Sequence, residues 1–417
     1  MGEYHVYGGK RLFGELAIVG GKNAALPILA AAVLGKKSII HNCPKISDTF
    51  CTMEILTKLG CDVNFEGRTA VVDTGGLDTF VLPQEYMAKM RSSIIFAGGL
   101  LGRFGQAIIS PPGGCKLGER PIALHLDAFQ QLGAKIWTKD GLIHIKASRL
   151  EGAKIPLSFP SVGATQNAML AAVLARGTTV IKNAAKEPEI VDLQDFLNTM
   201  GAKVSGAGSS CLIIEGVKEL QDAEYTIMPD RIVAGTYLTA ATITGGEIRL
   251  TDVPNKGIRP ITDLLKETGA QIWEEDNSIT LSAKGRPRAL RQVVTGPHPA
   301  FPTDMQPQLT ALLATADGSS FINERVFESR DKHIGQLRIM GANISNRDKQ
   351  NFHILGVNQL QGATVRAHDL RSGAALILAG LGAEGETVVQ DCTHIRRGYE
   401  AIDKDLRVLG AEIKAES

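Results

Sequence analysis

Apolar and polar positions follow one pattern that recurs along the whole chain. Its clearest marker is a short phrase, KLGCDV in the first copy, in which a helix-like run ends at glycine and a strand-like run follows. The phrase returns roughly every 70 residues, with its glycines at Gly60, Gly133, Gly201, Gly269, Gly341 and Gly410. A repeat of this length is typical of one supersecondary unit. The sequence therefore predicts six copies of one unit.

Each unit begins with a stretch of small apolar residues, such as NAALPILAAAVLG or ATQNAMLAAVLARG. Such stretches are typical of buried, closely packed helices that end at glycine. A short strand, an amphipathic helix and two further strands follow, and this order predicts an α/β fold with crossover connections. The sixth unit stops at GAEIKAES, while the residues from His5 resemble those from His353. We therefore expect the N-terminal strand to complete the last unit.

The length of the chain indicates the number of domains, and its net charge indicates which kinds of partner to expect. A chain of 417 residues is longer than one hydrophobic core usually serves, which favours two domains. With 45 basic and 44 acidic residues, the net charge of +1 gives no general attraction to nucleic acids or membranes. The N-terminus lacks an apolar signal segment, and the most apolar run is short and contains Pro27. We expect a cytoplasmic protein with no nucleic-acid or membrane partner.

The first residue of each buried helix can be found by counting back from the glycine that ends it. Cations occupy this position in four units, Gly163 in the third and Asp304 in the fifth; the four cations are Lys22, Arg91, Arg231 and Arg371. A cation there is unfavourable by about 0.3–1 kcal/mol, because a helix N-terminus carries partial positive charge. Several such starts could form a shared anion site. Alternatively, each cation is a surface residue paired with a nearby carboxylate.

Asp304 supplies a carboxylate where its counterparts supply cations. It could simply stabilise the N-terminus of its own helix. It could also act as a base or orient a hydroxyl group of a substrate. The sequence pattern leaves both interpretations open.

One cysteine stands apart from the others. Cys115 lies in SPPGGCKLGERP, within the longest of the six spans that run from the glycine ending a buried helix to the phrase glycine. The glycines and prolines around it favour a mobile lid. Lys116 and Arg120 should stabilise its thiolate, whereas Glu119 should oppose this. We expect a reactive thiol here. The other cysteines lie in or beside apolar runs and are predicted to be small buried residues: Cys43, Cys51, Cys61, Cys211 and Cys392.

The sequence carries no metal or cofactor signature. The cysteines and histidines show no metal-ligand spacing. LGKKS resembles the end of a phosphate-binding loop, but Ala30 stands where that motif needs glycine. We therefore expect no metal and no cofactor.

At this point the chain resembles the UDP-N-acetylglucosamine 1-carboxyvinyltransferase family of enolpyruvyl transferases over nearly its whole length. The motifs that carry the resemblance are GGKNAALPILAA, PPGGCKLGERP, FPSVGAT, PDRIVAGT, HPAFPTDMQ, DLRSGAALILAGL and HIRRGYE. The resemblance implies an inside-out α/β barrel of two domains, each with three βαβαββ-type units. One domain would span residues 22–228, and the other residues 1–21 with 229–417. The active site would lie between them.

The resemblance also implies an activity. Such enzymes transfer the enolpyruvyl group of phosphoenolpyruvate to the 3-hydroxyl of UDP-N-acetylglucosamine and release phosphate. This is the first committed step of peptidoglycan synthesis, on which cell wall formation, cell shape and division depend. Cys115 would be the lid thiol that donates a proton or forms a transient adduct, and that fosfomycin alkylates. No cofactor is implied.

Site residues are implied by the same motifs. The catalytic residues would be Cys115, Asp304, Lys22 and Arg397. Phosphoenolpyruvate would be bound by Lys22, Asn23, Arg120, Arg371 and Arg397. The UDP-sugar would be bound by Arg91, Arg120, Pro121, Ile122, Ala123, Leu124, Ser161, Val162, Gly163, Asp304 and Val326.

Three residues depart from the family pattern. Val233 stands where glutamate is common, Asp331 where phenylalanine is common, and Glu119 where a small residue is usual. An alternative is a transferase like 5-enolpyruvylshikimate-3-phosphate synthase, which is not expected to carry the GGC loop. A second alternative, from another class, is a ring-shaped DNA clamp built from the six repeats.

Overall fold

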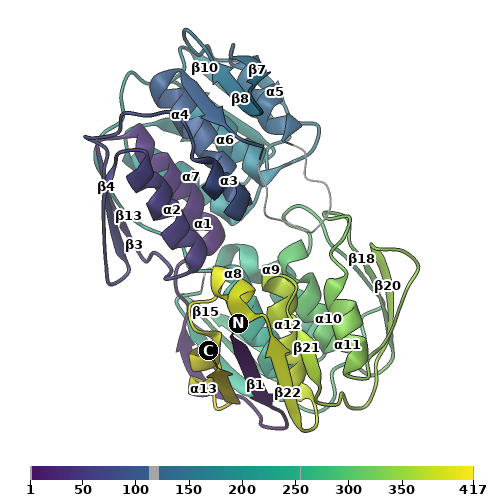
Figure 1. The fold of residues 1–417 in the computed structure, drawn as a ribbon. Coiled ribbons are helices and arrows are strands. Elements are labelled where there is room, and N and C mark those ends of the chain that lie inside the picture. Colours follow the sequence, from purple (N-terminus) through teal and green to yellow (C-terminus); the bar gives the residue numbers. More distant parts are fainter. Residues whose placement is uncertain (1, 112–121, 254, 417) are drawn as a thin grey trace. The chain divides into compact units, whose positions relative to one another are not determined.

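A computed structural model describes residues 2–111, 122–253 and 255–416 (Figure 1). These residues form two compact units. Unit N comprises residues 20–111 and 122–228, and unit C comprises residues 2–19 with 229–416. Each unit has its own hydrophobic core. Within the described residues, no helix is long and apolar enough to cross a membrane.

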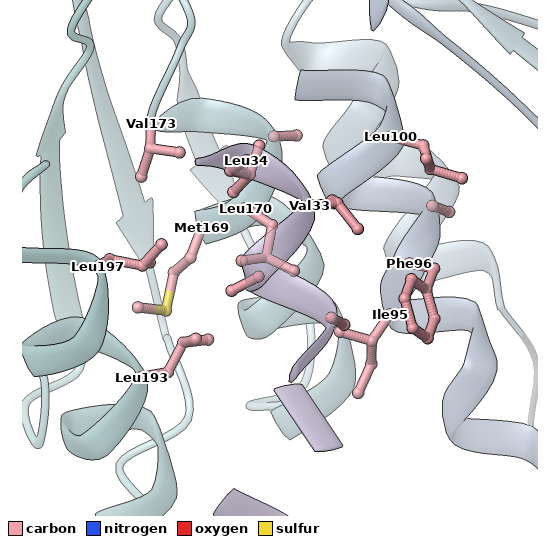
Figure 2. Close-up of a cluster of buried hydrophobic side chains, with 14 of the residues drawn as sticks. Val33, Leu34, Ile95, Phe96, Leu100, Met169, Leu170, Val173, Leu193 and Leu197 are labelled. Carbon is pink, nitrogen blue, oxygen red and sulfur yellow. The ribbon is translucent and has the colours of Figure 1, made fainter. Parts of the chain in front are cut away.

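The helices of unit N fall into two groups. Three buried stretches of small apolar residues pack against one another at the centre: α1 (Lys22–Ala31) with η1 (Ala32–Leu34), η2 (Arg91–Ile95) with α4 (Phe96–Phe104), and α6 (Val162–Ala172). The other helices are α2 (Ser47–Lys58), α3 (Gln84–Lys89), α5 (Ala123–Gln131) and α7 (Pro188–Thr199). Apolar side chains from α1, η1, η2, α4, α6 and α7 fill the space between the helices (Figure 2).

Glycine lets the central helices of unit N approach closely. A Cβ atom at Gly99 would lie 2.7 Å from Val33 Cγ2, and one at Gly102 would lie 2.8 Å from the carbonyl oxygen of Leu170. Both distances are shorter than real Cβ contacts. The small-residue stretches are therefore needed for helix packing.

Three sheets belong to unit N. Their strand orders are β13-β3-β5-β4, β6-β8-β7 and β11-β12-β10-β9. The strands are β3 (Lys37–His41), β4 (Asp62–Glu66), β5 (Thr69–Asp73), β6 (Gln106–Ile109), β7 (Lys135–Lys139), β8 (Leu142–Lys146), β9 (Lys154–Pro156), β10 (Thr178–Lys182), β11 (Lys203–Ser205), β12 (Cys211–Glu215) and β13 (Ala223–Thr226). Many strand residues alternate between buried and exposed, so each sheet turns one face to the core.

Unit C repeats this plan. Its central helices are α8 (Arg231–Thr244), α10 (Gln306–Leu313), which follows η3 (Thr303–Met305), and α12 (Leu370–Gly382). The others are α9 (Asn255–Glu267), α11 (Lys332–Ile339), η4 (Cys392–Arg397) and α13 (Ile402–Val408). The sheets have the orders β15-β16-β14-β2, β17-β18-β20-β19 and β21-β22-β1-β23.

The strands of unit C complete the description. They are β1 (Glu3–Tyr7), β2 (Phe13–Ala17), β14 (Glu247–Thr251), β15 (Gln271–Glu275), β16 (Ser278–Ser282), β17 (Gln292–Val294), β18 (Ser319–Asn323), β19 (Asn343–Asn346), β20 (Asn351–Leu355), β21 (Thr364–Arg366), β22 (Glu386–Gln390) and β23 (Glu412–Glu416). β1 lies antiparallel between β22 and β23, so the start of the chain supplies the middle strand that the last repeat lacks.

Five of the six sheets also contain a short parallel strand that precedes a central helix in the chain. The order read from the repeat omitted this strand, because it is only three to five residues long. In the sheet of β6 it is reduced to a single bridge between Val81 and Ile108. Two of these strands belong to the sheets of the other unit. β2 precedes α1 of unit N but pairs with β14 in unit C, and β13 precedes α8 of unit C but pairs with β3 in unit N. The α/β class predicted from the sequence is confirmed.

Candidate active site

Asp304 is the centre of a charged cluster in unit C. It lies in η3, at the start of the fifth central helix. Its Oδ1 atom is 2.9 Å from Arg330 Nη2, and its Oδ2 atom is 3.1 Å from Arg371 Nη2. The two arginine side chains are 5% and 4% exposed, whereas the aspartate side chain is 25% exposed. Two buried guanidinium groups thus hold one carboxylate that solvent can still reach.

At two helix starts, an aspartate at the N-cap position offsets the unfavourable interaction between the arginine and the helix N-terminus. Asp369 caps α12, and its carboxylate accepts hydrogen bonds from the backbone N–H groups of Arg371 and Ser372 at 3.0 Å each. Asp230 caps α8 in the same way, immediately before Arg231. Each carboxylate offsets a cation at its helix N-terminus. Both arginines are buried, so for them the alternative of a surface residue is wrong.

Arg371 is held by a second partner as well. Its Nη1 atom lies 3.5 Å from the hydroxyl oxygen of Tyr399, which is 2.8 Å from the hydroxyl of Thr236. Burial by itself would lower the pKa of the Arg371 guanidinium, but the Asp304 carboxylate raises it, and the net shift is upward. Burial raises the pKa of Tyr399 and outweighs the opposing effect of Arg371. Arg371 therefore stays charged and Tyr399 stays protonated.

A buried carboxylate, Glu324, organises the neighbouring loop. Its Oε1 atom accepts hydrogen bonds from the backbone N–H groups of Val326 at 2.8 Å and Phe327 at 3.1 Å, and from the Thr295 hydroxyl at 2.8 Å. Glu324 follows directly after β18, so the end of that strand fixes its position. These three hydrogen bonds and a fourth from the Thr303 hydroxyl satisfy the buried carboxylate.

Glu324 also reaches the Asp304 cluster. The hydroxyl of Thr303 donates to Glu324 Oε2 at 2.9 Å and accepts a hydrogen bond from Arg330 Nη1 at 2.8 Å. Two predicted UDP-sugar residues, Asp304 and Val326, are therefore connected through Glu324, Thr303 and Arg330. Glu324 and Arg330 were not predicted as site residues, because nothing in the local pattern around 320–330 indicates these long-range contacts.

Arg397 comes from a different element of unit C. It is the last residue of η4, is partly buried, and η4 packs against α12, the helix that carries Arg371. Tyr399 lies two residues further on, in the HIRRGYE motif. Tyr399 was not predicted as a site residue, although it lies in this motif close to Arg397.

In unit N, Lys22 and Asn23 are the first two residues of α1. Lys22 Nζ lies 2.6 Å from Asp48 Oδ2, and both side chains are largely buried. Asp48 comes from the first turn of α2, in the same repeat. The cation at the start of α1 is thus balanced by the next helix of its own repeat.

The predicted UDP-sugar residues of unit N lie at helix starts. Arg91 begins η2, Ile122 caps α5, and Ala123 and Leu124 are the first residues of α5. Ser161 caps α6, with its hydroxyl oxygen accepting from the Ala164 N–H at 3.3 Å, and Val162 and Gly163 begin that helix. α6 packs against both α5 and η2. Backbone N–H groups at such helix starts are suited to bind phosphate.

A histidine links two of these helix starts. His125 Nδ1 lies 2.7 Å from Asn167 Nδ2, while Asn167 Oδ1 accepts from the Gly98 N–H at 2.7 Å. This orients the amide so that Nδ1 of the histidine is the acceptor and Nε2 carries the hydrogen. A Cβ atom at Gly163 would lie 3.0 Å from His125 Cε1. His125 was not among the predicted site residues, which end at Leu124 in this segment.

Some predictions fall on residues outside the described part. Cys115, Arg120 and Pro121 lie there, and so does Glu119. Val233 is buried in the first turn of α8, and Asp331 precedes α11 without capping it through its side chain. Among the described residues, no group of three or more His, Cys, Asp or Glu side chains could hold a metal ion.

The prediction for the remaining cysteines was partly wrong. Cys43, Cys61 and Cys392 are buried, whereas Cys51 is only partly buried and Cys211 is exposed. Cys211 starts β12, in which the exposed and buried positions alternate. An apolar run is not enough to predict burial in a strand, because every second side chain faces outward.

Comparisons with known proteins agree with this architecture. A family model described as EPSP synthase (3-phosphoshikimate 1-carboxyvinyltransferase) matches residues 6–406. A protein of Caldanaerobacter subterraneus named UDP-N-acetylglucosamine 1-carboxyvinyltransferase 2 is 49% identical over 99% of both chains. One of Symbiobacterium thermophilum named UDP-N-acetylglucosamine 1-carboxyvinyltransferase 1 is 50% identical over 98% of this chain and 94% of the relative.

Solved structures give the same result. The enolpyruvyl transferase NikO from Streptomyces tendae has a TM-score of 0.88 and 27% identity, covering 99% of this chain and 98% of that one. EPSP synthase from Acinetobacter baumannii, at 18% identity and full coverage of both chains, shares the fold with a TM-score of 0.75. The predicted two-domain, inside-out α/β fold is thereby confirmed. The chain belongs to the EPSP synthase family of enolpyruvyl transferases.

Proposed function

We propose that this protein transfers the enolpyruvyl group of phosphoenolpyruvate to the 3-hydroxyl of UDP-N-acetylglucosamine and releases phosphate. The observation that carries this proposal is that four relatives named for this activity are 44–50% identical over nearly the whole chain. The reaction would be the first committed step of peptidoglycan synthesis. We place the reaction in the cytoplasm.

The Asp304 cluster supports this chemistry. Arg371 is a proposed phosphoenolpyruvate residue and Asp304 a proposed contact of the sugar hydroxyl, and the two are in direct contact at 3.1 Å. A carboxylate fixed by two guanidinium groups has a defined orientation. We propose that it accepts the hydrogen bond of the 3-hydroxyl and so directs that oxygen toward the donor.

The reaction needs an acid, an oriented hydroxyl and an anion clamp. Protonation of the methylene carbon of phosphoenolpyruvate makes the neighbouring carbon electrophilic, and the hydroxyl oxygen then forms a bond to it. The hydroxyl proton is lost. In the tetrahedral intermediate the C–O bond to phosphate then breaks while the methyl carbon gives up a proton, and this forms the C=C bond of the enol ether. We propose Cys115 as the acid and Lys22, Asn23, Arg120, Arg371 and Arg397 as the clamp.

Nucleotide binding is assigned to the helix starts of unit N. We propose that Arg91, with Arg120, and the first residues of α5 and α6 bind the UDP-sugar, because helix N-termini attract phosphate. His125 would support this site by fixing Gly163 against its ring. In unit C, Val326 would complete the contacts. The residues of both units would thus serve the same pair of substrates.

Phosphate release by the purified full chain tests the proposal. We expect release that requires both phosphoenolpyruvate and UDP-N-acetylglucosamine, that fosfomycin blocks, and that falls strongly in Cys115→Ser. Comparing Cys115→Asp with Cys115→Ser distinguishes acid catalysis, which aspartate can retain, from a purely thiol-dependent step. Release with shikimate 3-phosphate in place of the UDP-sugar would instead assign the chain to the other branch of the family.

A further inference from the structure

The hairpin of β7 and β8 carries an unbalanced positive surface in unit N. Lys135, Lys139 and Lys146 are exposed on its outer face, and none forms an ion pair with a described residue. The hairpin contains one carboxylate, Asp140, in the turn. The chain as a whole is almost neutral, so this surface is a local feature. We call it the lysine face.

The lysine face surrounds an exposed aromatic residue. Trp137 is 43% exposed and its ring stacks on that of His144, with centroids 5.1 Å apart and planes 15° apart. Lys135 lies directly opposite Lys146 in the ladder, as Trp137 does His144. Like charges at directly opposite positions destabilise a sheet. The structure thus keeps a repulsive pair without a compensating carboxylate.

The repeat provides a matched comparison in the hairpin of β15 and β16. Trp273 stands at the same place after the phrase glycine as Trp137 and is 52% exposed. The residues equivalent to the three lysines are Gln271, Glu275 and Ser282. Glu275 lies 3.4 Å from Arg249, so charge there is balanced. The exposed tryptophan is therefore a property of the repeat, whereas the positive charge is specific to the β7 hairpin.

The position of β7 in its sheet gives the face a free edge. The described strands have the order β6-β8-β7, so β7 has a neighbour on one side. An edge strand presents backbone N–H and C=O groups that can pair with an added strand. Lysines on an edge strand also hinder pairing of two copies of this chain, because like charges would meet.

We propose that the lysine face and the edge of β7 bind an extended acidic segment of another protein. The added strand would pair with the β7 backbone, and carboxylates four residues apart would face Lys135 and Lys139. Trp137 lies between them on the same face, so an apolar side chain midway between the two carboxylates would contact it. A polypeptide is favoured over single-stranded nucleic acid because one side of the tryptophan ring is already covered by His144 and because the backbone edge is available.

The two tryptophans allow a specific test, since the chain contains no others. In a Trp273→Phe protein the fluorescence reports on Trp137, and in a Trp137→Phe protein it reports on Trp273. The probe is a synthetic peptide with the repeat Glu-Thr-Val-Thr, in which glutamate and valine alternate on one face of an extended strand. We expect a saturable, salt-sensitive change at Trp137 and none at Trp273.

A variant that copies the control hairpin sharpens the test. Lys135→Gln, Lys139→Glu and Lys146→Ser together should weaken binding at least about tenfold, because three exposed charge pairs are lost. Lys203→Ala, on the edge strand β11, should bind as the parent does. A backbone N-methylated peptide should bind more weakly, since it cannot complete the strand ladder.

Several outcomes would overturn the proposal. These are the absence of a saturable change at Trp137, an equal change at Trp273, and equal binding by the triple variant. Undiminished binding of the N-methylated peptide would contradict strand addition. Binding of a single-stranded oligonucleotide without binding of the peptide would assign the face to another class of partner.

Discussion

Equivalent helix starts of the two units balance charge in different ways. In unit N, the cation Lys22 is paired with Asp48 from the next helix of its own repeat. In unit C, Asp304 from the fifth repeat is paired with Arg371 from the sixth and with Arg330. One carboxylate in unit C therefore connects two repeats, whereas the pair of Lys22 and Asp48 lies within one repeat. The repeat determines the position of these residues at the helix starts. The residue type at that position determines whether the side chain pairs within its own repeat or with a residue of another repeat.

The largest effect should follow from removing the shared carboxylate. Asp304→Asn leaves two buried guanidinium groups without their anion, so we expect a loss of stability of about 3 kcal/mol. Because the variant also loses the proposed hydroxyl contact, kcat should fall by about 100- to 1,000-fold. Urea unfolding and steady-state kinetics measure the two effects. Asp317→Asn, whose carboxylate is an exposed partner of Arg286, is the matched control and should change neither.

Glu324 offers a test that separates positioning from chemistry. Glu324→Ala leaves four donors without their acceptor and should cost about 2–3 kcal/mol of stability. Because Val326 is a proposed UDP-sugar contact, KM for UDP-N-acetylglucosamine should rise more than KM for phosphoenolpyruvate. Glu324→Gln keeps part of the hydrogen bonding and should recover part of both losses. Equal changes in the two KM values would argue against a positioning role.

A smaller effect is expected for the Lys22–Asp48 pair of unit N. Asp48→Asn keeps a polar partner for Lys22 but removes its charge, so we expect a loss of about 1–2 kcal/mol. The effect on kcat should be well below that of Asp304→Asn. Urea unfolding of Asp48→Asn and Asp304→Asn under the same conditions compares their losses of unfolding free energy. A larger loss for Asp48→Asn would contradict the stronger coupling that we assign to unit C.

A fall in pH should change the stability contributions of one buried group in each unit in opposite directions. The two groups are His333 in unit C and Asp192 in unit N. Burial lowers the pKa of His333 to about 4, so this group favours the folded state above its ordinary pKa of 6.5, and that contribution is lost as the pH falls toward 4. Burial raises the pKa of Asp192 to about 6 from 3.8, so its contribution is present at low pH and is lost as the pH rises through 6.

Unfolding of two variants across pH 4–7 measures these contributions. Relative to the parent, His333→Gln should become less destabilised as the pH falls from 6.5 to 4, because the parent then loses the histidine contribution. Asp192→Asn should become less destabilised as the pH rises from 4 to 6. Parallel stability curves for parent and variant would contradict either shift.

The sequence predicted the repeat better than the contacts between repeats. The six phrase glycines and the small-residue helices indicated the fold class, because both are local patterns. The short parallel strands were absent from the order read from the repeat and entered only through the family resemblance, since three residues of a strand such as β9 give no periodic signal. The aspartates before Arg231 and Arg371 were readable as caps, but the pairing of Asp304 with Arg330 and Arg371 depends on tertiary packing. The exposed Cys211 shows the same limit for side-chain burial.

Product analysis in a competition experiment tests the proposed function most directly. The full chain would receive isotopically labelled phosphoenolpyruvate with equal amounts of UDP-N-acetylglucosamine and shikimate 3-phosphate, and mass spectrometry would identify the labelled product. We expect the enolpyruvyl group on the UDP-sugar alone, in amounts equal to the phosphate released, and none with Asp304→Asn at the same early time. Labelled enolpyruvyl shikimate phosphate as the main product would contradict the proposal.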